Sequence, residues 1–447
     1  MIHALSPAAV PAGRPLRPWA PALLALCVAI LSPISLAQAP AQAPATLSLA
    51  QALRLAEDRS SQLTAQDAAA AGAREMAIAA GQRPDPTLKI GLSSLPVNGP
   101  DALTLTRDSF TMLSVGVMQE LTRADKLQAR AARFEREAEA ALAGRALALA
   151  NLRRDTALAW LDRHFQQRWR DLLQQQRAET ALQIDAAEAA FRGGGVGRGA
   201  LADVFAARQA LAQVDDRLRQ LDQQVAAAQT RLTRWVGPAA EQALAPPPAL
   251  DVLRLASGPL EARLDHHPQL GLIASQQALA LADAQIARAA QRADWSLELS
   301  YSQRGPAFSN MLSINLAIPL RWDPGQRQDR ELAARLATVA QLRAQREEAQ
   351  REHLAEARGW LQQWQGQRGR LAFHDSVLIP LAAQRSQAAV AAYRGGGGAL
   401  PMVLDARRGE IDAQIERLRL EMDSAVLWAQ LEFLTTADPT HPQETAP

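Results

Sequence analysis

Three groups of residues in this sequence have types and spacing that could support chemistry. The first is His266-His267, which follows Asp265 and precedes Pro268, and two imidazoles beside a carboxylate are ligands that zinc accepts. No second cluster of His, Cys or Glu stands at a ligand spacing, and the remaining helical histidines are expected to be isolated: His164, His353 and His374. We therefore interpret the pair as a solvated helix end and predict no metal site.

The second group is the glycine-rich run from 193 to 199, which superficially resembles a phosphate-binding loop. It lacks the Lys-Ser/Thr ending of such loops and follows a helical pattern instead of a strand, so we exclude phosphate binding. The sequence also has no paired carboxylates, nucleophile–base set or cofactor motif in a supporting context. We predict that the chain is not an enzyme and binds no cofactor.

The third group is a pair of turns that repeat one another, Phe191-Arg192-Gly193-Gly194-Gly195 and Tyr393-Arg394-Gly395-Gly396-Gly397. Each places an aromatic residue, an arginine and a glycine run between two long helical segments. Glycine ends helices and tolerates positive φ, so each run predicts the tight turn of a helical hairpin. The copies stand 202 positions apart, which indicates a duplicated chain.

The composition fits long helices. Ala, Leu, Gln and Arg dominate the 447 residues, and aromatic residues make up only 4%. The formal net charge is +2, and lysine occurs only at Lys89 and Lys126. Nothing in this balance indicates nucleic-acid binding.

Residues 1–37 have the pattern of an export signal. Arg14 and Arg17 precede an apolar run from Leu23 to Leu36, which is about half the length of a membrane-spanning helix. Small residues place the favoured cleavage site after Ala37. The alternative is an N-terminal membrane anchor.

The only cysteine, Cys27, lies inside this apolar run and follows Leu26, where a lipoprotein signal needs a small residue. We therefore expect no lipid anchor and a mature chain without disulfides. The Ala/Pro/Gln-rich stretch 38–47 is predicted to be a flexible leader.

The first repeat is predicted to span residues 48–245. Two helices come first, then strands at about 87–94 and 110–118 with apolar residues at alternate positions, then a long helical hairpin over 127–236. The return helix of this hairpin carries apolar residues in two registers of seven, which is a coiled-coil seam. These residues are Val204, Leu211, Leu218, Val225 and Leu232, and Ala207, Val214, Leu221, Ala228 and Trp235.

The second repeat follows the same plan after a proline-rich linker, with a kink expected at Pro380. Met311-Leu312-Ser313-Ile314 corresponds to Met112-Leu113-Ser114-Val115 of the first repeat. The predicted segments are the linker 246–257, the repeat 258–434 with strands at about 295–302 and 311–320 and a hairpin over 328–434, and a disordered tail 435–447.

Two short hairpins leave open sheet edges and are not stable alone. The strong alternation, and the aromatic residues Trp295 and Tyr301 that flank one strand, fit strands that face lipid. In lipid only a closed sheet satisfies every backbone group, so four strands per chain could close only by assembly with other copies; three chains would give about twelve strands. The alternative is a small soluble sheet packed on the helices.

The duplicated order of helices, strand pair, long helix, glycine turn and return helix resembles the TolC family of outer-membrane efflux channels over about residues 46–435. The twin turns are its most specific pieces. The run Arg83-Pro84-Asp85-Pro86 and the loop from Leu95 to Asp101 further resemble the CzcC-like heavy-metal branch.

This resemblance implies a mainly α fold with a small membrane β part. It implies a homotrimer in the outer membrane whose twelve-stranded barrel continues as a helical tunnel into the periplasm. It also implies docking to a periplasmic adaptor that is joined to an inner-membrane RND pump, with heavy-metal cations as cargo; drugs or other small molecules are the alternative.

The resemblance also implies roles for individual residues. The docking tips would be Arg192, Gly193, Gly194, Gly195, Arg198, Arg394, Gly395, Gly396 and Gly397. Asp203 and Asp405 match positions that narrow the closed periplasmic end in this family. Met402 stands where relatives often carry a second acid, and the first turn is longer than the family pattern.

The alternative roles for these residues are local ones. The arginines would cap the last carbonyls of their helices, and the acids would favour the beginnings of the return helices. The rival class is a periplasmic coiled-coil adaptor or scaffold, which usually carries one helical hairpin within β-rich modules; this sequence has two hairpins and two strand pairs in matching order.

Overall fold

The structure is a computed structural model, which describes residues 46–193, 201–253, 264 and 266–434. Residues 45–447 form one unit. The predicted signal peptide and tail lie outside the described residues, as do nearly all of the leader and part of the linker. Leu47, which the sequence assigned to the leader, is buried, and its carbonyl accepts a hydrogen bond from the indole Nε1–H of Trp160 at 3.1 Å.

Two short helices open the described chain. Helix α1 (Leu49–Asp58) begins at a capping box in which the Ser48 hydroxyl accepts from the Gln51 amide and the Gln51 side chain accepts from the Ser48 amide. Helix α2 (Ser61–Ala80) begins after Ser60, whose hydroxyl accepts from the Leu63 amide. Both helices thus begin after a serine, a residue that is preferred at the N-cap position.

The first long hairpin consists of α3 (Ala124–Arg192) and α4 (Leu201–Val236), followed by the short 3-10 helix η1 (Gly237–Glu241). Most of the predicted heptad positions of α4 are buried. They are Val204, Ala207, Val214, Leu218, Leu221, Ala228 and Leu232. The coiled-coil seam predicted from the sequence is therefore the buried face of α4.

The second half contains α6 (Pro268–Ala289), α7 (Gln328–Phe373), α8 (Ile379–Arg394) and α9 (Leu400–Glu432). A single π-helical turn, η3 (His374–Leu378), joins α7 to α8. The interruption that was expected at Pro380 thus lies just before it. Proline removes a backbone donor and crowds the preceding turn, so its effect falls on the residues ahead of it.

The four strands form one antiparallel sheet in the order β1 (Thr87–Ser93), β2 (Met112–Leu121), β3 (Trp295–Gln303) and β4 (Met311–Ala317). The hairpins were predicted; the pairing of β2 with β3 joins the two repeats and puts Val115 opposite Tyr301. Strand β4 ends three residues before the predicted bound because Pro319 has no N–H to continue the ladder.

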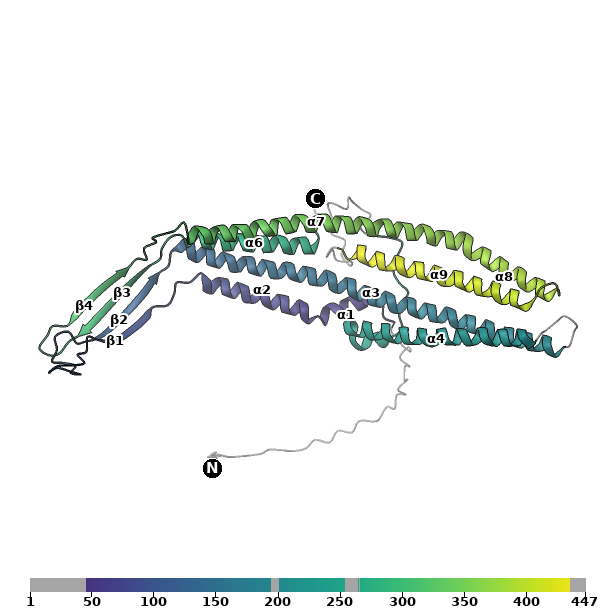
Figure 1. The fold of residues 1–447 in the computed structure, drawn as a ribbon, viewed down its shortest axis with the longest axis horizontal. Helices are drawn as coiled ribbons and strands as arrows, with labels where there is room; N and C mark the ends of the chain where they lie inside the picture. Colours follow the sequence, from purple (N-terminus) through teal and green to yellow (C-terminus); the bar gives the residue numbers. More distant parts are fainter. Residues whose placement is uncertain (1–45, 194–200, 254–263, 265, 435–447) are drawn as a thin grey trace, which may run out of the picture. The chain divides into compact units, whose positions relative to one another are not determined.

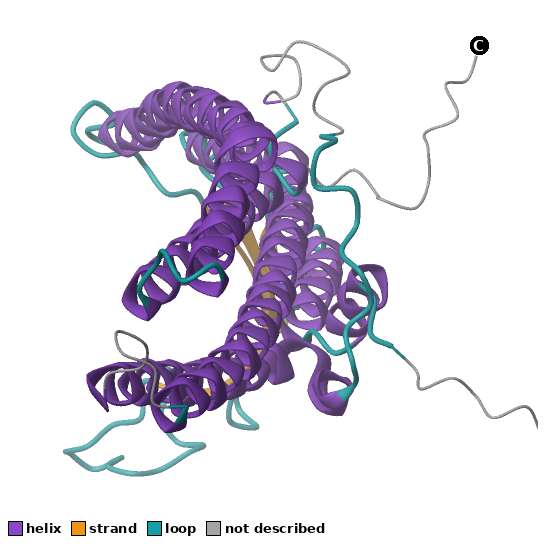
Figure 2. Ribbon diagram, turned by 90° about the vertical axis from the view of Figure 1, so that its right-hand side faces the viewer, coloured by secondary structure: helices purple, strands orange, loops and turns teal. Residues whose placement is uncertain are grey.

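The helices and the sheet occupy opposite regions of this unit. Figure 1 shows the sheet beyond one end of α3 and α7, and the free ends of the α3–α4 and α8–α9 hairpins at the other. Helix α3 lies against α2, α4 and α6, and α6 against α7. Figure 2 shows these helices stacked as curved rows.

The largest buried cluster lies where α1, α3, α4, α7 and α9 meet. Trp160, Leu161 and Phe165 of α3 are at its centre and are at most 1% exposed. Trp364 of α7 and Trp428 of α9 pack against the same cluster. It therefore joins the first repeat to the second.

Among the helices of the described residues, none combines the length and apolar character needed to traverse a lipid bilayer.

Candidate functional site

The second glycine turn is a tight connection between α8 and α9. Gly395 ends α8 in a right-handed conformation, and Gly396 follows with φ +81°, which only glycine adopts without strain. The amides of Gly397 and Gly398 both donate to the carbonyl of Ala392, at 3.0 and 3.1 Å. The sequence prediction of a glycine-dependent hairpin turn is confirmed here.

The first turn is described only at its edges. Gly193 ends α3, and its amide donates to the Ala189 carbonyl at 3.0 Å. Gly194, Gly195 and Arg198 lie outside the described residues, so their predicted roles stay predictions. The return helix α4 begins at Leu201.

The fold brings the two hairpin ends together, although the turns are far apart in the sequence. Ala187 and Val204 of the first hairpin form one buried cluster with Leu400 and Val403 of the second. Tyr393, the aromatic residue of the second repeat motif, packs against this cluster and is partly buried. The described ends of the two hairpins therefore lie together, and we call the region around this cluster of Ala187, Val204, Leu400 and Val403 the hairpin tip.

Arg192 does not hydrogen-bond the carbonyls of its helix among the described contacts; it pairs with Glu188 one turn earlier, at 3.2 Å. Arg208 of α4 binds the same carboxylate at 2.8 Å. The hydrogen bond from Arg208 is the main cause that lowers the pKa of Glu188, and the charge of Arg192 adds to it. Glu188 thus fastens α3 to α4 near the tip and keeps its negative charge.

Arg394 is exposed and forms no ion pair with a described residue that would occupy its guanidinium. Asp405, one turn into α9, forms an ion pair with Arg385 of α8 at 2.5 Å, and both side chains are about two-thirds exposed. Asp203 lies in the first turn of α4 and is half-buried. The two predicted gate acids thus lie near the beginnings of the two return helices but not at equivalent positions, because Asp203 is the third residue of α4, whereas the third residue of α9 is Met402 and Asp405 is the sixth.

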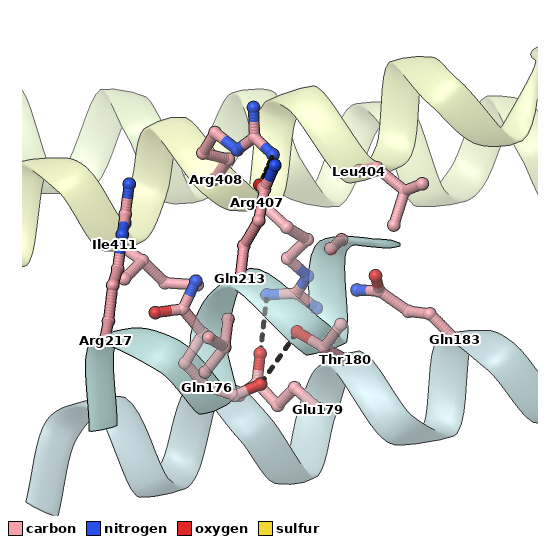
Figure 3. A pocket seen from close by; sticks show the side chains of 12 residues that line it. Gln176, Glu179, Thr180, Gln183, Gln213, Arg217, Leu404, Arg407, Arg408 and Ile411 are labelled. Carbon is pink, nitrogen blue, oxygen red and sulfur yellow. Dashed lines mark hydrogen bonds and ion pairs between the residues drawn. The ribbon is translucent and has the colours of Figure 1, made fainter. Parts of the chain in front are cut away.

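Behind the tip, a cavity of about 40 Å³ lies between α3, α4 and α9 (Figure 3). Arg407 of α9 reaches Glu179 of α3 at 4.0 Å, and Arg408 donates to the side-chain oxygen of Gln213 of α4 at 3.2 Å. Figure 3 shows these side chains converging from all three helices. The space suits ordered water and is too small for a cargo molecule.

Sequence reasoning missed an apolar part of the hairpin tip. Leu201 and Phe205 of α4 are 51% and 59% exposed, and Met402 of α9 is 64% exposed. Phe205 stands one position after Val204, off both heptad registers, so its exposure could have been read from the sequence. Exposed aromatic and methionine side chains are enriched where proteins dock.

The sheet exposes a continuous apolar face. Two glutamines lie towards the ends of this face, Gln303 opposite Leu113 and Gln119 opposite Leu297. The other registered rows contain apolar side chains, for example Ile90 opposite Val115 and Leu299 opposite Ile314. These side chains are half to two-thirds exposed, as are their neighbours. The face comprises Leu88, Ile90, Leu92, Leu113, Val115, Val117, Leu297, Leu299, Tyr301, Leu312, Ile314 and Leu316.

The opposite face of the sheet is polar. Lys89 of β1 reaches across β2 to Glu298 of β3, with Nζ and Oε2 2.6 Å apart. The strands β1 and β4 are the two edges of the sheet, and neither outer edge has a partner strand within the described residues. A single chain therefore leaves the apolar face of the sheet without a packing partner. It also leaves the outer edges of β1 and β4 without partners for their backbone hydrogen bonds.

One sequence expectation about the histidines is wrong. His353, expected to be isolated, stacks on His267 with ring centroids 4.3 Å apart, because α7 passes the beginning of α6. The Nδ1 of His267 accepts from the Gln269 amide, and His353 faces Glu356 at 3.2 Å. Within the described residues no group of three or more His, Cys, Asp or Glu side chains is arranged to hold a metal ion.

No protein-family model and no curated protein matches this sequence. Solved structures do resemble the fold of this chain. The outer membrane protein VceC of Vibrio cholerae aligns with a TM-score of 0.70 over 86% of this chain and 95% of that chain, at 18% identity. The outer-membrane channel OprN aligns with a TM-score of 0.72 over 87% and 90%, also at 18% identity.

The Neisseria gonorrhoeae MtrE outer membrane channel, solved in its open state, aligns with a TM-score of 0.68 over 86% of this chain and 88% of that chain, at 16% identity. The chain is thus similar to outer-membrane channels over most of its length and has the TolC-like fold that its repeat pattern implied. At these identities the likeness establishes the fold.

Proposed function

We propose that this chain is one subunit of a homotrimeric outer-membrane channel, the passive exit duct of a tripartite RND-type efflux system. The observation that carries the proposal is the sheet. It has one apolar face that is exposed, one polar face, and two edges without partner strands in the described part of the chain.

Closure by sister copies would satisfy these groups together. If β1 of one copy pairs with β4 of the next, three copies close a ring of about twelve strands and no backbone edge faces lipid. The apolar face then contacts the membrane and the polar face lines a lumen. A single chain in water would instead leave Ile90 and Ile314, each 69% exposed, in contact with solvent.

The helices would extend the passage into the periplasm. Helix α3 has 69 residues, which at 1.5 Å per residue gives about 100 Å. Its far end is the hairpin tip, at the opposite end of the unit from the sheet (Figure 1). This arrangement supports an outer-membrane location for the sheet and a periplasmic location for the tip.

The oligomer and its location are tested together. The protein should fractionate with the outer membrane, need detergent for extraction, migrate as a trimer, and form pores in planar lipid bilayers. A monomer that stays soluble without detergent and forms no pores would refute the proposal and favour a periplasmic scaffold.

For the hairpin tip we propose docking of a periplasmic adaptor, which connects the channel to an inner-membrane pump. The described part of the tip offers the second glycine turn, Arg192, Arg394 and the exposed side chains of Phe205 and Met402. Compact turns leave room for a partner chain to approach closely.

The docking test uses a glycine that can accept a side chain. A Cβ at Gly397 would meet only the Ala392 carbonyl, at 4.0 Å, so Gly397→Leu should fold and still block close approach of the adaptor. Efflux should be lost while trimers persist in the outer membrane. Gly359→Leu, at a position with open space in the middle of α7, is the matched control. Normal efflux in Gly397→Leu would refute docking at this turn.

For Asp203 and Asp405 we propose a role in narrowing the periplasmic end. Both lie in the first two turns of their return helices, and Asp405 joins α9 to α8 through Arg385. Carboxylates from three copies would face one another around a central axis and could be drawn together or apart by their cation partners.

For the cargo we propose heavy-metal cations. The support is the sequence run Arg83-Pro84-Asp85-Pro86 before β1 and the loop from Leu95 to Asp101 after it. The alternative cargo is drugs or other small molecules. Deleting the gene should lower tolerance of metals such as zinc, cobalt or cadmium and leave drug tolerance unchanged; the opposite pattern would refute the metal assignment.

A further inference from the structure

The polar face of the sheet consists mainly of short side chains; its longer ones are Met112, Met118, Met311 and three ionisable residues. Strand residues alternate between the faces, so the face that carries Lys89 also carries Gly91 and Ser93 of β1. On β2 and β3 it carries small residues opposite one another in register, such as Gly116 opposite Ser300. On β4 it carries Ser313, Asn315 and Ala317 beside Met311.

Three ionisable side chains extend beyond the short side chains of this polar face. They are Lys89 on β1, Glu120 on β2 and Glu298 on β3, and β4 contributes none. Lys89 and Glu298 form an ion pair, whereas Glu120 accepts a hydrogen bond from the Thr122 hydroxyl at 3.3 Å and has no ion pair with a described cation. One lysine against two glutamates leaves one negative charge per chain on this face.

The Lys89–Glu298 pair spans a whole strand. Lys89 is registered with Gly116 of β2, and Gly116 is registered with Ser300 of β3. A Cβ at Gly116 would lie 2.8 Å from the Ser300 Cβ, so β2 and β3 approach each other closely at this row. The absent side chain leaves the Lys89 chain a clear path over β2 to the Glu298 carboxylate.

Both lysines of the sequence form ion pairs near β3. Lys89 and Lys126 are the only two in the chain, and both pair with carboxylates at the beginning of β3 or just before it. Lys126 binds Asp294, and both of those side chains are nearly buried, so that pair fastens α3 to the sheet. The side chains of the Lys89–Glu298 pair are 46% and 25% exposed, and they therefore contact the water on the polar face.

From this arrangement we infer that Lys89, Glu120 and Glu298 form the fixed-charge ring of the channel lumen and set its preference between cations and anions. The inference rests on the proposed function, because it requires the polar face to line a pore. Three copies supply three negative charges in excess, so the lumen favours cations. The Lys89–Glu298 pair moderates the preference, since each lysine cancels one carboxylate.

The strength of this effect depends on screening. The screening length is about 10 Å at 0.1 M salt and about 30 Å at 0.01 M. A ring of charges on the wall therefore influences the centre of a wide lumen mainly at low salt. The selectivity of the channel should accordingly increase as the salt concentration falls.

The experiment measures reversal potentials of single channels in planar bilayers under a KCl gradient near 0.01–0.1 M. Glu298→Gln should lower the potassium-to-chloride permeability ratio about twofold or more, and Lys89→Gln should raise it by a similar factor. The double variant Lys89→Gln/Glu298→Gln keeps the net charge of the face and should match the unmodified channel. Glu120→Gln should lower the ratio as Glu298→Gln does.

The experiment distinguishes a failure of the proposed channel function from a failure of the charge-ring inference. If the unmodified protein forms no pores, the proposed function fails. If pores form and the two single variants leave the permeability ratio unchanged at 0.01 M, or shift it in the same direction, the charge-ring inference is overturned. Size-exclusion chromatography in detergent shows that each variant is a trimer before its channels are recorded.

Discussion

The helical region of this chain has a buried apolar core, whereas the sheet exposes its apolar side chains. In the helical region Trp160 and Phe165 are at most 1% exposed and lie in a cluster drawn from five helices. In the sheet, Leu88, Ile90 and Ile314 are 63–69% exposed. In the sequence, the apolar residues of both regions recur at regular intervals, with the helical period in one and at alternate positions in the other.

The difference shows where one chain suffices and where it does not. The seam of α4 and the central cluster around Trp160 are formed within a single copy, although some helical apolar side chains, such as Leu182 and Leu381, stay more than half exposed. The sheet has no second layer over its apolar face within the described residues, and a sheet of four strands with open edges is marginal by itself. In the proposed channel, lipid and neighbouring copies would supply the contacts that the sheet lacks.

The largest effect that would test this comparison is in the helical core. Trp160→Ala should lower the free energy of unfolding by about 3–5 kcal/mol, because it leaves a cavity and removes the donor to the Leu47 carbonyl. Trp322→Ala is the control, since that side chain is 88% exposed, and it should change the helical stability little. Denaturant unfolding followed by far-UV circular dichroism in detergent measures both; equal losses would contradict the assignment of the core.

The next effect concerns the apolar face of the sheet. Ile314→Lys, in the middle of β4, should cost about 2–4 kcal/mol in a bilayer and almost nothing in water, because only lipid penalises the charge. The neighbouring change Ser313→Lys places the same charge on the polar face and serves as its control. Outer-membrane yield should fall for the first variant alone, and an equal yield for both would argue that the apolar face does not contact lipid.

Acid should weaken the helical region through a buried histidine. Burial beside His353 lowers the pKa of His267 to about 4, whereas the unfolded chain takes up the proton near its ordinary value of about 6.5. The unfolded state therefore binds more protons in this window, and stability falls as the pH drops from about 6.5 to about 4, by up to about 3 kcal/mol per chain.

The matched variant for this prediction is His267→Asn. Asparagine can cap α6 as His267 does, through the amide of Gln269, but it does not titrate. Midpoints of denaturant unfolding measured between pH 7 and pH 4 should depend less on pH in this variant. An unchanged pH dependence would mean that His267 is not the responsible group.

The smallest expected effect is at the hairpin tip. Asp405→Asn removes an exposed ion pair with Arg385 and should change stability by about 0–1 kcal/mol. If Asp405 narrows the periplasmic end, the same variant should nevertheless raise single-channel conductance. Conductance equal to that of the unmodified channel would leave the residue a structural role only.

The sequence was most informative where a signal is local. The heptads of α4 and the alternation from Leu312 to Leu316 each depend on neighbours along the chain, and each corresponds to the observed element. The second glycine turn was equally accessible because Gly396 adopts a conformation that other residues avoid.

The sequence was least informative where residues distant in the chain meet. Nothing near His353 indicates that it stacks on His267, 86 positions earlier, and nothing near Lys89 indicates its pairing with Glu298. The site residues are a mixed case. Arg192, Asp203 and Asp405 could be named from their motifs, whereas the bond of Arg208 to Glu188 and that of Arg385 to Asp405 became evident only in the fold.

By itself, the sequence determined the duplicated order of elements, the long helices and the two-faced strands, because hydrophobic periodicity and glycine or proline stops act over a few residues. Only the tertiary structure decided that β2 joins β3, that Ala187 and Val204 meet Leu400 and Val403 at one tip, and that the sheet's apolar face is left uncovered. These features depend on contacts between segments some 200 residues apart. Many alternative pairings would bury similar side chains, and the packing of the whole chain selects among them.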